Sequence, residues 1–215
     1  MQTISLPYGR DRVEAQIPDQ RLAAVLRSGA QSYRPQADQA QLVRQALENP
    51  IGTPPLRELA KGKHQVVIIS SDHTRPVPSK VILPQLVDEI RAGSPSAEIT
   101  VLVATGFHRP TTREEMLDKY GQELFLRSGL HFAVHLSGKD EDMVSLGTLP
   151  SGGKLLINKL AAQADLLVAE GFIEPHFFAG FSGGRKSVLP GVARPPYWPI
   201  TAPLSLTAPL PAPAS

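Results

Sequence analysis

The chain has 215 residues, of which 41% are hydrophobic and 20% are charged, a composition typical of soluble globular proteins. Its formal charge of +2 is too small to indicate nucleic-acid binding, and the absence of cysteine excludes disulfide bonds and thiolate metal sites. No apolar run approaches the length of a transmembrane helix, and the N-terminus lacks the charged and apolar regions of a signal peptide. We therefore expect a cytoplasmic protein that has neither nucleic acid nor a membrane as its partner.

The first part of the chain is predicted to form two strands followed by helical segments. Short strands are expected at residues 2–6 and 11–17, around a Tyr-Gly-Arg-Asp turn, and the second alternates polar and apolar residues. A helix is expected over residues 37–47, where apolar residues share one stripe. The proline-rich run at residues 49–56 ends it, and a further short turn of helix is expected at residues 56–60.

Two continuous apolar runs, residues 65–70 and 98–104, predict strands that are buried on both faces of a sheet. The first run ends at a polar and charged segment, residues 71–79, which precedes a helical segment at residues 80–92. Ser79 is the expected cap of that helix. Because α/β sheets place their ligands at the ends of buried strands, the polar segment is a candidate binding segment.

The second buried strand repeats the pattern of the first. It ends at residues 105–110, where polar and charged side chains again follow an apolar run. Thr111 and Thr112 come next, and with Glu114 and Glu115 they resemble the capped start of a helix.

The remaining elements complete an alternation of strands and helices. A strand is expected at residues 131–135, where His131 and His135 share one face and are interpreted as structural or partly exposed. Residues 154–169 are expected to form a strand, a short helix and a strand in that order. This alternation predicts an α/β fold with a mainly parallel sheet and flanking helices.

A glycine-rich loop, residues 171–193, follows the last predicted strand. It contains five glycines, His176 and Lys186, and a helix is expected to begin near Ser187. Glycines allow backbone N–H groups to approach an anion, and Lys186 would add a positive charge beside them. Taken alone, so short a motif more often marks a surface loop.

Three loops of the predicted sheet carry reactive side chains to one edge. Asp72, Arg75, His108, His176 and Lys186 all follow predicted strands, and the carboxyl ends of parallel strands meet at the same edge of a sheet. Simpler interpretations of single residues stay open. Asp72 and Arg75 could form an ion pair, and Lys186 could bind a phosphate, although the full Walker spacing is absent.

Three motifs stand at these strand ends: Ser-Asp-His-Thr-Arg-Pro at residues 71–76, Thr-Gly-Phe-His-Arg-Pro at residues 105–110, and a segment at residues 174–187 that contains Glu-Pro-His and Gly-Gly-Arg-Lys-Ser. Together they resemble the signatures of a known family, the N-terminal domain of lactate racemase and its relatives. Residues 49–56 are also similar to that family, and the likeness covers roughly residues 5–193. The resemblance implies a Rossmann-like N-terminal domain of a two-domain enzyme, with the second domain missing from this chain.

Members of this family use a nickel-pincer nucleotide, which is a pyridinium mononucleotide with two sulfur donors and a carbon bound to nickel. The resemblance implies that Lys186 forms a covalent link to this cofactor and that Asp72, His73, Thr74 and Arg75 bind it. His73 by itself is interpreted as structural, although it lies within that segment. The family's nickel-ligand histidine is absent from this chain, so no metal ligand is expected within it.

The activity that the resemblance implies is the racemisation of a small 2-hydroxy acid such as lactate. The C2–H bond must break and hydrogen must return to the opposite face; if the hydrogen leaves as hydride, the hydroxyl must also lose its proton. The resemblance implies His108 and His176 as the paired acid and base, a role that suits imidazole because it titrates near neutral pH. Arg75 would also hold the substrate carboxylate through two hydrogen bonds.

The family pattern is expected to end at residue 193. Residues 194–215 contain seven prolines and one charged residue, so we interpret them as a disordered tail outside a family domain at residues 1–193. Codons for residues 196–202, read one base out of frame, permit Thr-Ile-Leu-Ala-Asn-His-Gly, which is similar to the family's continuation. Our hypothesis is that the tail is out-of-frame translation of a truncated gene, and DNA codons that cannot yield Asn-His in a shifted frame would refute it.

A chain without the second domain is expected to be a weakly active or inactive fragment, unless a separate C-terminal domain completes it in trans. Two other functions stay open. One is a non-catalytic α/β domain that binds a nucleotide or phosphate. The other is a generic phosphate-binding transferase, which would bind ATP and have no use for paired histidines.

Overall fold

The computed structural model describes residues 1–29, 32–150, 152–176 and 180–194. The chain divides into two compact units, Met1–Asp38 and Gln39–Ser215. The proline-rich segment, predicted above to be a disordered tail, lies outside the described residues apart from Arg194. Among the described helices, none is both long and apolar enough to cross a membrane.

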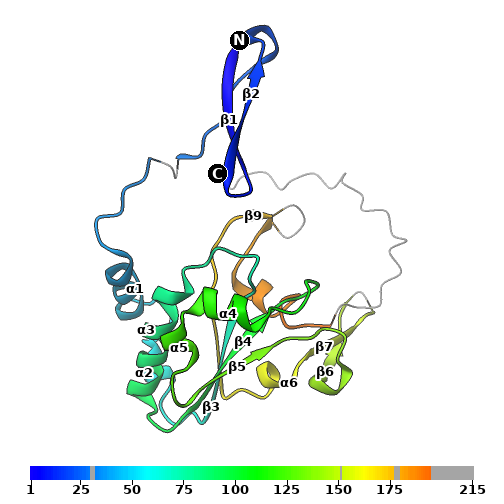
Figure 1. Ribbon diagram of the computed structural model, residues 1–215. Coiled ribbons are helices and arrows are strands. Elements are labelled where there is room, and N and C mark those ends of the chain that lie inside the picture. Colours follow the sequence, from blue (N-terminus) through cyan, green and yellow to red (C-terminus); the bar gives the residue numbers. More distant parts are fainter. Residues whose placement is uncertain (30–31, 151, 177–179, 195–215) are drawn as a thin grey trace, which may run out of the picture. The chain divides into compact units, whose positions relative to one another are not determined.

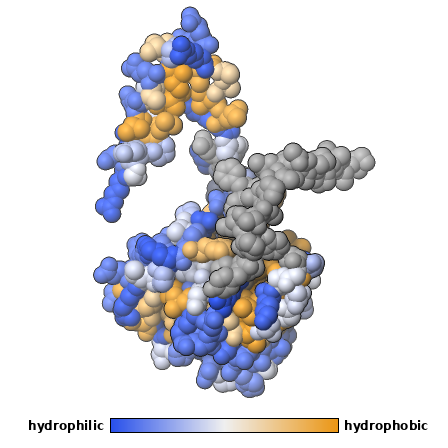
Figure 2. Space-filling model, turned by 90° about the vertical axis from the view of Figure 1, so that its right-hand side faces the viewer, coloured by the Kyte–Doolittle hydropathy of each residue, from blue (hydrophilic) through white to orange (hydrophobic). Residues whose placement is uncertain are grey.

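The first unit contains a β-hairpin followed by a short 3-10 turn. Its elements are β1 (Gln2–Tyr8), β2 (Asp11–Ile17) and η1 (Asp19–Arg21). The two strands pair antiparallel, which confirms the strands predicted here. The register sets Ile4 opposite Ala15 and Leu6 opposite Val13, so apolar side chains share one face of the hairpin. Figure 2 shows hydrophobic residues gathered on this unit.

The second unit is built on a four-stranded parallel sheet with the strand order β5-β4-β3-β8 (Figure 1). In chain order its strands are β3 (Gln65–Ser71), β4 (Glu98–Ala104), β5 (Leu130–Val134) and β8 (Leu166–Ala169). All three strand pairings are parallel. The structure therefore confirms the mainly parallel α/β fold that the alternation of strands and helices predicted.

Helices cover one face of this sheet (Figure 1). They are α1 (Gln39–Glu48), α2 (Leu56–Leu59), α3 (Ser79–Gly93), α4 (Arg113–Tyr120) and α5 (Gln122–Phe125). The larger core cluster lies on this side, where Ile68 and Val101 of the sheet pack with Leu83 and Ile90 of α3. Each of these four side chains is fully buried, and burial of one such side chain stabilises the fold by about 1.5–3 kcal/mol.

The opposite face is covered by an antiparallel strand pair, a short helix and a returning segment of chain. The elements are η3 (Asp140–Asp142), β6 (Met143–Thr148), β7 (Lys154–Asn158) and α6 (Lys159–Ala162). Ile69 and Leu102 of the sheet pack here against Ile157 and Val192. The strand predicted near residues 154–157 is confirmed, but it pairs with β6 outside the main sheet. The sequence did not predict β6 because this mostly exposed strand lacks an apolar run.

The two predicted helix caps have different outcomes. Thr112 caps α4 through the expected capping box, in which its hydroxyl accepts the N–H of Glu115 and its own N–H donates to the Glu115 carboxylate. Ser79 was predicted to cap α3, and this is wrong because Pro78 holds the N-cap position. The Ser79 hydroxyl instead donates to Oε1 of Glu170 at 2.6 Å. That acceptor arrives from a distant strand, so the local sequence could not reveal it.

The order of strands reverses between β3 and β8. The chain runs outward from β3 through β4 to β5, and then crosses back to place β8 on the other side of β3. The loops that leave β3 and β8 therefore lead away from each other at the carboxyl edge of the sheet. Open α/β sheets bind their ligands in the crevice that such a reversal creates.

Candidate functional site

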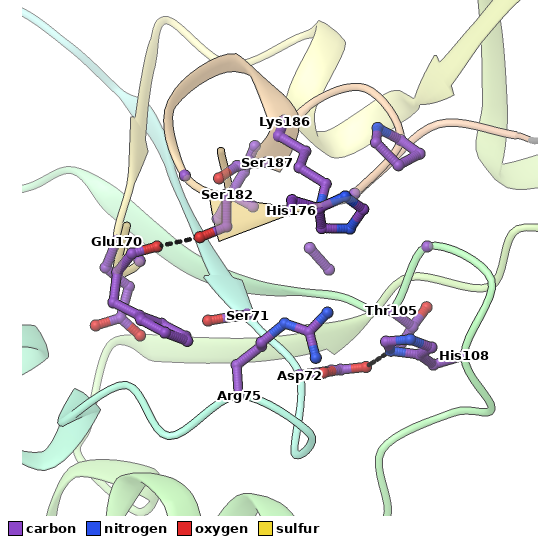
Figure 3. A pocket seen from close by; sticks show the side chains of 18 of the residues that line it. Ser71, Asp72, Arg75, Thr105, His108, Glu170, His176, Ser182, Lys186 and Ser187 are labelled. Carbon is purple, nitrogen blue, oxygen red and sulfur yellow. Dashed lines mark hydrogen bonds and ion pairs between the residues drawn. The ribbon is translucent and has the colours of Figure 1, made fainter. Parts of the chain in front are cut away.

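A cavity of about 360 Å³ is lined by the ends of β3, β4 and β8 and by the loops that follow them. All five residues that the sequence placed at this edge line the cavity: Asp72, Arg75, His108, His176 and Lys186 (Figure 3). The predicted convergence of three loops therefore occurs. It lies at the strand reversal, where the topology of the sheet favours a ligand site.

The five side chains come from two facing walls. Figure 3 shows Asp72, Arg75 and His108 on the side formed by the loops after β3 and β4. His176 and Lys186 extend from the glycine-rich loop on the other side. A small molecule in the cavity would thus meet one imidazole from each wall and have cationic groups beside it.

The glycine-rich loop forms its wall from two very short strands and a 3-10 turn. They are β9 (Pro175–His176), β10 (Gly180–Phe181) and η4 (Gly184–Ser187). Ser182 braces the base of the loop, because its hydroxyl donates to the Phe172 carbonyl at 2.8 Å and accepts the N–H of Glu174 at 2.9 Å. The helix predicted to begin near Ser187 is wrong, since η4 ends there and Pro190 follows within one turn.

Gly191 allows the end of this loop to pack closely on itself. A Cβ atom at this position would lie 2.2 Å from the carbonyl oxygen of Ser187, so a larger residue would displace the backbone. The carbonyl of Gly191 accepts the N–H of Gly106 at 3.0 Å. This hydrogen bond joins the glycine-rich loop to the loop after β4, and so connects the two walls.

Asp72 and His108 form a hydrogen-bonded pair at the cavity. Oδ2 of Asp72 lies 2.5 Å from Nδ1 of His108, and Oδ1 accepts the N–H and the hydroxyl of Thr74 at 3.1 and 2.6 Å. Asp72 is only 2% exposed. Burial by itself would raise the pKa of Asp72, but the hydrogen bonds from Thr74 and His108 outweigh it and lower the pKa. An ionised carboxylate beside Nδ1 favours the neutral tautomer of His108 that carries its proton on Nδ1 and leaves Nε2 as the acceptor.

One simple interpretation of the sequence was an ion pair between Asp72 and Arg75. The structure describes both residues and shows no such pair. The guanidinium of Arg75 donates to Oγ1 of Thr74 at 3.2 Å, and the carbonyl of Arg75 accepts the ammonium of Lys119 at 3.1 Å. Arg75 and Lys186 both line the cavity. Burial lowers the pKa of Lys186, and the positive charge of Arg75 lowers it further. Two cations in one cavity fit an anionic ligand.

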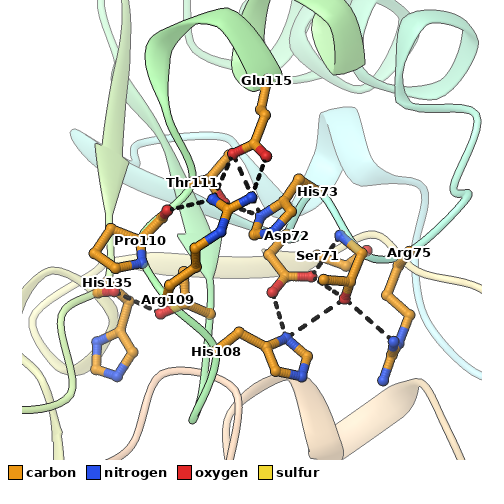
Figure 4. Close-up of polar contacts among 12 residues, drawn as sticks. Ser71, Asp72, His73, Arg75, His108, Arg109, Pro110, Thr111, Glu115 and His135 are labelled. Atoms are coloured by element: carbon orange, nitrogen blue, oxygen red, sulfur yellow. Dashed lines mark hydrogen bonds and ion pairs between the residues drawn. The ribbon is translucent and has the colours of Figure 1, made fainter.

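His73 and Thr74 lie outside the cavity lining, although the resemblance placed them in the cofactor-binding segment. Thr74 supports Asp72, and Nδ1 of His73 lies 3.0 Å from Oγ1 of Thr111 (Figure 4). His131 is exposed, and His135 is buried with its ring between the Ala193 carbonyl and the side chain of Asn158. Burial lowers the pKa of His135, which is consistent with the structural role predicted for it.

Glu170 is a residue of this site that the sequence analysis missed. It follows β8 directly, lines the cavity and is 5% exposed. Its Oε1 accepts the hydroxyls of Ser70 and Ser79 at 2.5 and 2.6 Å, while Oε2 has no partner among the described residues. Burial raises the pKa of this carboxyl group. An acidic residue directly after an apolar strand was the available signal.

The donor set of the cavity suits an anionic organic group. Arg75 and Lys186 supply positive charge, and Ser71 lines the cavity with a buried hydroxyl that has no partner among the described residues. Within the described ranges, no group of three or more histidine, aspartate or glutamate side chains is placed to hold a metal ion. The described residues thus fit a ligand held through charge and hydrogen bonds.

These features define a class: an α/β domain with a cavity at a strand reversal, whose lining of cationic side chains and two imidazoles suits an anionic small molecule. The chain belongs to the family described as lactate racemase N-terminal domain, whose sequence model matches residues 8–196. It is 58% identical over 193 residues to a lactate racemase of Thermoanaerobacterium thermosaccharolyticum, and 54% identical over 193 residues to one of Lactiplantibacillus plantarum. These alignments cover 90% of this chain but 45% of each relative, so the chain spans less than half the length of these curated relatives.

Solved structures agree with the family assignment. The apoprotein of the Thermoanaerobacterium thermosaccharolyticum lactate racemase superposes with a TM-score of 0.79 and 56% identity, over 89% of this chain and 44% of that one. A protein from Thermotoga maritima superposes with a TM-score of 0.54 and 26% identity, over 65% of this chain and 38% of that one. The α/β architecture and the family are therefore both shown for this chain.

Proposed function

We propose that this chain is the cofactor- and substrate-binding half of a lactate racemase-like enzyme that acts on lactate or another small 2-hydroxy acid. The observation that carries the proposal is the meeting of Asp72, Arg75, His108, His176 and Lys186 in one cavity of a chain from this family. These are the residue types needed to hold a carboxylate, to move a hydroxyl proton and to attach a cofactor.

Arg75 is proposed to bind the carboxylate of the substrate. A guanidinium offers two parallel N–H donors, which match the two oxygens of a carboxylate. The Lys119 ammonium holds the carbonyl of Arg75 at 3.1 Å and so supports the backbone that carries this side chain. With the carboxylate held there, the hydroxyl of the substrate lies within the cavity, between the two walls.

His108 and His176 are proposed to exchange the hydroxyl proton of the two enantiomers. The pairing of His108 Nδ1 with Asp72 supports this role, because it leaves Nε2 free to accept a proton while the carboxylate stabilises the imidazolium that forms. Their origin on facing walls (Figure 3) supports a division of labour in which each imidazole serves one enantiomer. Returning the proton to the product hydroxyl restores the neutral ring.

The cofactor is proposed to be the nickel-pincer nucleotide that the family resemblance implies. When bound, this group would supply the reversible removal of hydrogen from C2. The fit to this chain rests on the Arg75 guanidinium and on the Ser71 hydroxyl, which has no partner among the described residues; both suit a ligand with phosphate and carboxyl groups. Lys186 is proposed as the attachment point, because a lowered pKa leaves more of its amine neutral and nucleophilic for an acyl-type link. No residue of this chain is proposed as a ligand of the nickel.

We further propose that residues 1–193 form the family domain and that turnover needs the part of the enzyme that this chain does not span. That part could be supplied in trans as a separate C-terminal domain. The chain by itself is then expected to racemise weakly or not at all. The second candidate is a domain that holds the nucleotide cofactor without catalysis.

The test is an intact-mass measurement of the chain co-expressed with the enzymes that build the cofactor. We expect a mass increase that is lost in Lys186→Ala and kept in Lys159→Ala, because Lys159 is exposed on α6 and does not line the cavity. A folded protein with no adduct would refute the proposed attachment. Loading followed by racemisation on addition of the C-terminal part would support the enzyme, and loading without racemisation would support the non-catalytic alternative.

A further inference from the structure

A second set of contacts joins the loops after β3 and β4 through residues that do not line the cavity (Figure 4). We call it the Glu115 clamp, and its members are His73, Arg109, Thr111, Thr112 and Glu115. Two of them adjoin Asp72 and His108 in sequence: His73 follows Asp72, and Arg109 follows His108. The same two loops are therefore tied together twice, once through Asp72 and His108 and once through their neighbours.

The centre of the clamp is a bidentate salt bridge between Arg109 and Glu115. The guanidinium nitrogens of Arg109 lie 2.9 Å from Oε2 and 2.5 Å from Oε1 of Glu115, and Oε2 also accepts the N–H of Thr112 at 2.9 Å. The hydrogen bonds from Arg109 and then from the Thr112 backbone lower the pKa of Glu115 to about 2. Glu115 therefore stays ionised, and the clamp stays formed, across the pH range in which imidazoles titrate.

His73 brings the loop after β3 into the clamp. Its Nδ1 lies 3.0 Å from Oγ1 of Thr111 and 3.7 Å from Oε2 of Glu115, and Thr111 is itself buried. His73 and these partners do not line the cavity. This position explains why His73 adjoins the binding segment in sequence without lining the site.

The clamp can influence the orientation of the His108 side chain because few other contacts fix that side chain. Its ring is exposed, and its side-chain contacts among the described residues are the hydrogen bond to Asp72 and a longer approach of 3.4 Å to Thr74. The orientation of the ring thus depends on where the backbone at residues 108 and 109 lies relative to Asp72. Arg109 fixes that backbone to the start of α4.

We propose that Glu115, acting through Arg109, is a positioning residue. It keeps Nδ1 of His108 within hydrogen-bond distance of the Asp72 carboxylate, and so keeps the proton of the neutral imidazole on Nδ1. This inference rests on the proposed function, in which the Nε2 atom of His108 is the proton acceptor. Glu115 and Arg109 do not line the cavity and do not touch the substrate. Their proposed contribution is to set the tautomer and the orientation of the His108 ring.

The chain contains a matched control for a purely structural effect. Arg57 of α2 forms the same kind of bidentate salt bridge with Glu89 of α3, at 2.9 and 2.8 Å. Neither residue lines the cavity. The arginine and glutamate side chains are 48% and 18% exposed in the control pair, against 58% and 27% for Arg109 and Glu115. Loss of either pair should cost similar stability, so a selective effect on His108 isolates the positioning role.

The experiment is ¹⁵N NMR of the imidazole nitrogens in the purified chain, above the pH at which the ring is protonated. The ¹⁵N shifts of His108 report the fraction of the ring that carries its proton on Nδ1, the tautomer that free histidine disfavours. We expect that fraction to be high in the wild type, to fall in Arg109→Gln and Glu115→Gln, and to stay unchanged in Arg57→Gln and Glu89→Gln. Glutamine at residue 115 still completes a capping box, so α4 should keep its start.

The outcomes separate the two proposals. An unchanged Nδ1 fraction in Arg109→Gln and Glu115→Gln, or an equal fall in all four variants, overturns the clamp and leaves the proposed function standing. A wild-type ring that carries its proton on Nε2 contradicts the role of His108 itself, and the positioning role falls with it. A selective fall in the two clamp variants supports the inference.

Discussion

The carboxylate of Asp72 and the imidazole of His108, 36 residues apart in the chain, meet at 2.5 Å where the ends of two neighbouring strands come together. β3 and β4 pair in parallel with Ser71 opposite Ala104, so the residues that follow each strand start from adjacent positions. This hydrogen bond changes the role that we infer for Asp72. It was expected to bind cofactor, and its observed partners support a role in holding the tautomer of His108.

Asp72→Asn should lower the rate of racemisation strongly. Asparagine cannot stabilise an imidazolium as a carboxylate does, and general acid–base catalysis contributes about 10²- to 10⁴-fold to rates. Turnover should be measured with the cofactor and the part of the enzyme that this chain does not span. Asp88→Asn, which removes an exposed partner of Arg127, is the control. Equal rates in the two variants would contradict the proton-transfer role.

Arg75→Lys should weaken the binding of lactate although the positive charge remains. Lysine cannot form the paired hydrogen bonds of a guanidinium, and a charged hydrogen bond is worth about 1.5–3 kcal/mol, so Kd should rise by roughly 10- to 100-fold. The measurement is an NMR titration with lactate. Arg185→Lys, next to Lys186 but outside the cavity lining, should leave Kd unchanged. A normal Kd in Arg75→Lys would remove Arg75 from the carboxylate site.

Gly191→Ala should destabilise the protein and disturb the cavity wall. The new Cβ would lie 2.2 Å from a backbone oxygen, which cannot move as a flexible side chain could. Overpacking of this kind costs about 1–3 kcal/mol, measured as the free energy of unfolding in urea. The control is Gly138→Ala, where a Cβ meets nothing within 4 Å. Equal stabilities in the two variants would show that residue 191 does not need to be glycine.

Glu170→Gln should flatten the dependence of stability on pH. The pKa of Glu170 is raised in the folded protein, so its favourable contribution is complete below the unfolded pKa of about 4.3 and is lost as pH rises through the folded pKa. Each unit of difference corresponds to about 1.4 kcal/mol. The wild type should therefore lose stability relative to Glu170→Gln as pH rises above about 4.3, in unfolding experiments at a series of pH values.

The opposite sign is expected for Asp72 in the same experiments. Its pKa is lowered by the hydrogen bonds from Thr74 and His108, so its contribution is present above the unfolded pKa of about 3.9 and is lost as pH falls through the folded pKa. Asp72→Asn should therefore be less stable than the wild type at neutral pH, and the difference in stability should disappear only at strongly acidic pH.

For Glu170, the contradicting outcome is a pair of parallel curves of stability against pH for Glu170→Gln and the wild type. Such curves would show that Glu170 does not ionise differently in the folded state.

Much of the fold could be predicted because its signals are local. The apolar runs at residues 65–70 and 98–104 became β3 and β4, and the Thr-x-x-Glu pattern before α4 became a capping box. The predicted cap was wrong because a distant group decided the outcome: Ser79 donates to Glu170 instead of capping α3. The strand near residue 154 was predicted correctly, but its mostly exposed partner β6 was missed.

By itself the sequence determined the class of fold, the family and five of the residues at the carboxyl edge of the sheet, because periodicity and motif spacing are properties of the linear chain. Only the tertiary structure decided which of those residues act together. It separated His73 from the cavity, paired Asp72 with His108, and revealed Glu170 beside Ser70 and Ser79. The reason is physical: hydrogen bonds form over about 3 Å, and which atoms come that close depends on how the loops of three strands pack.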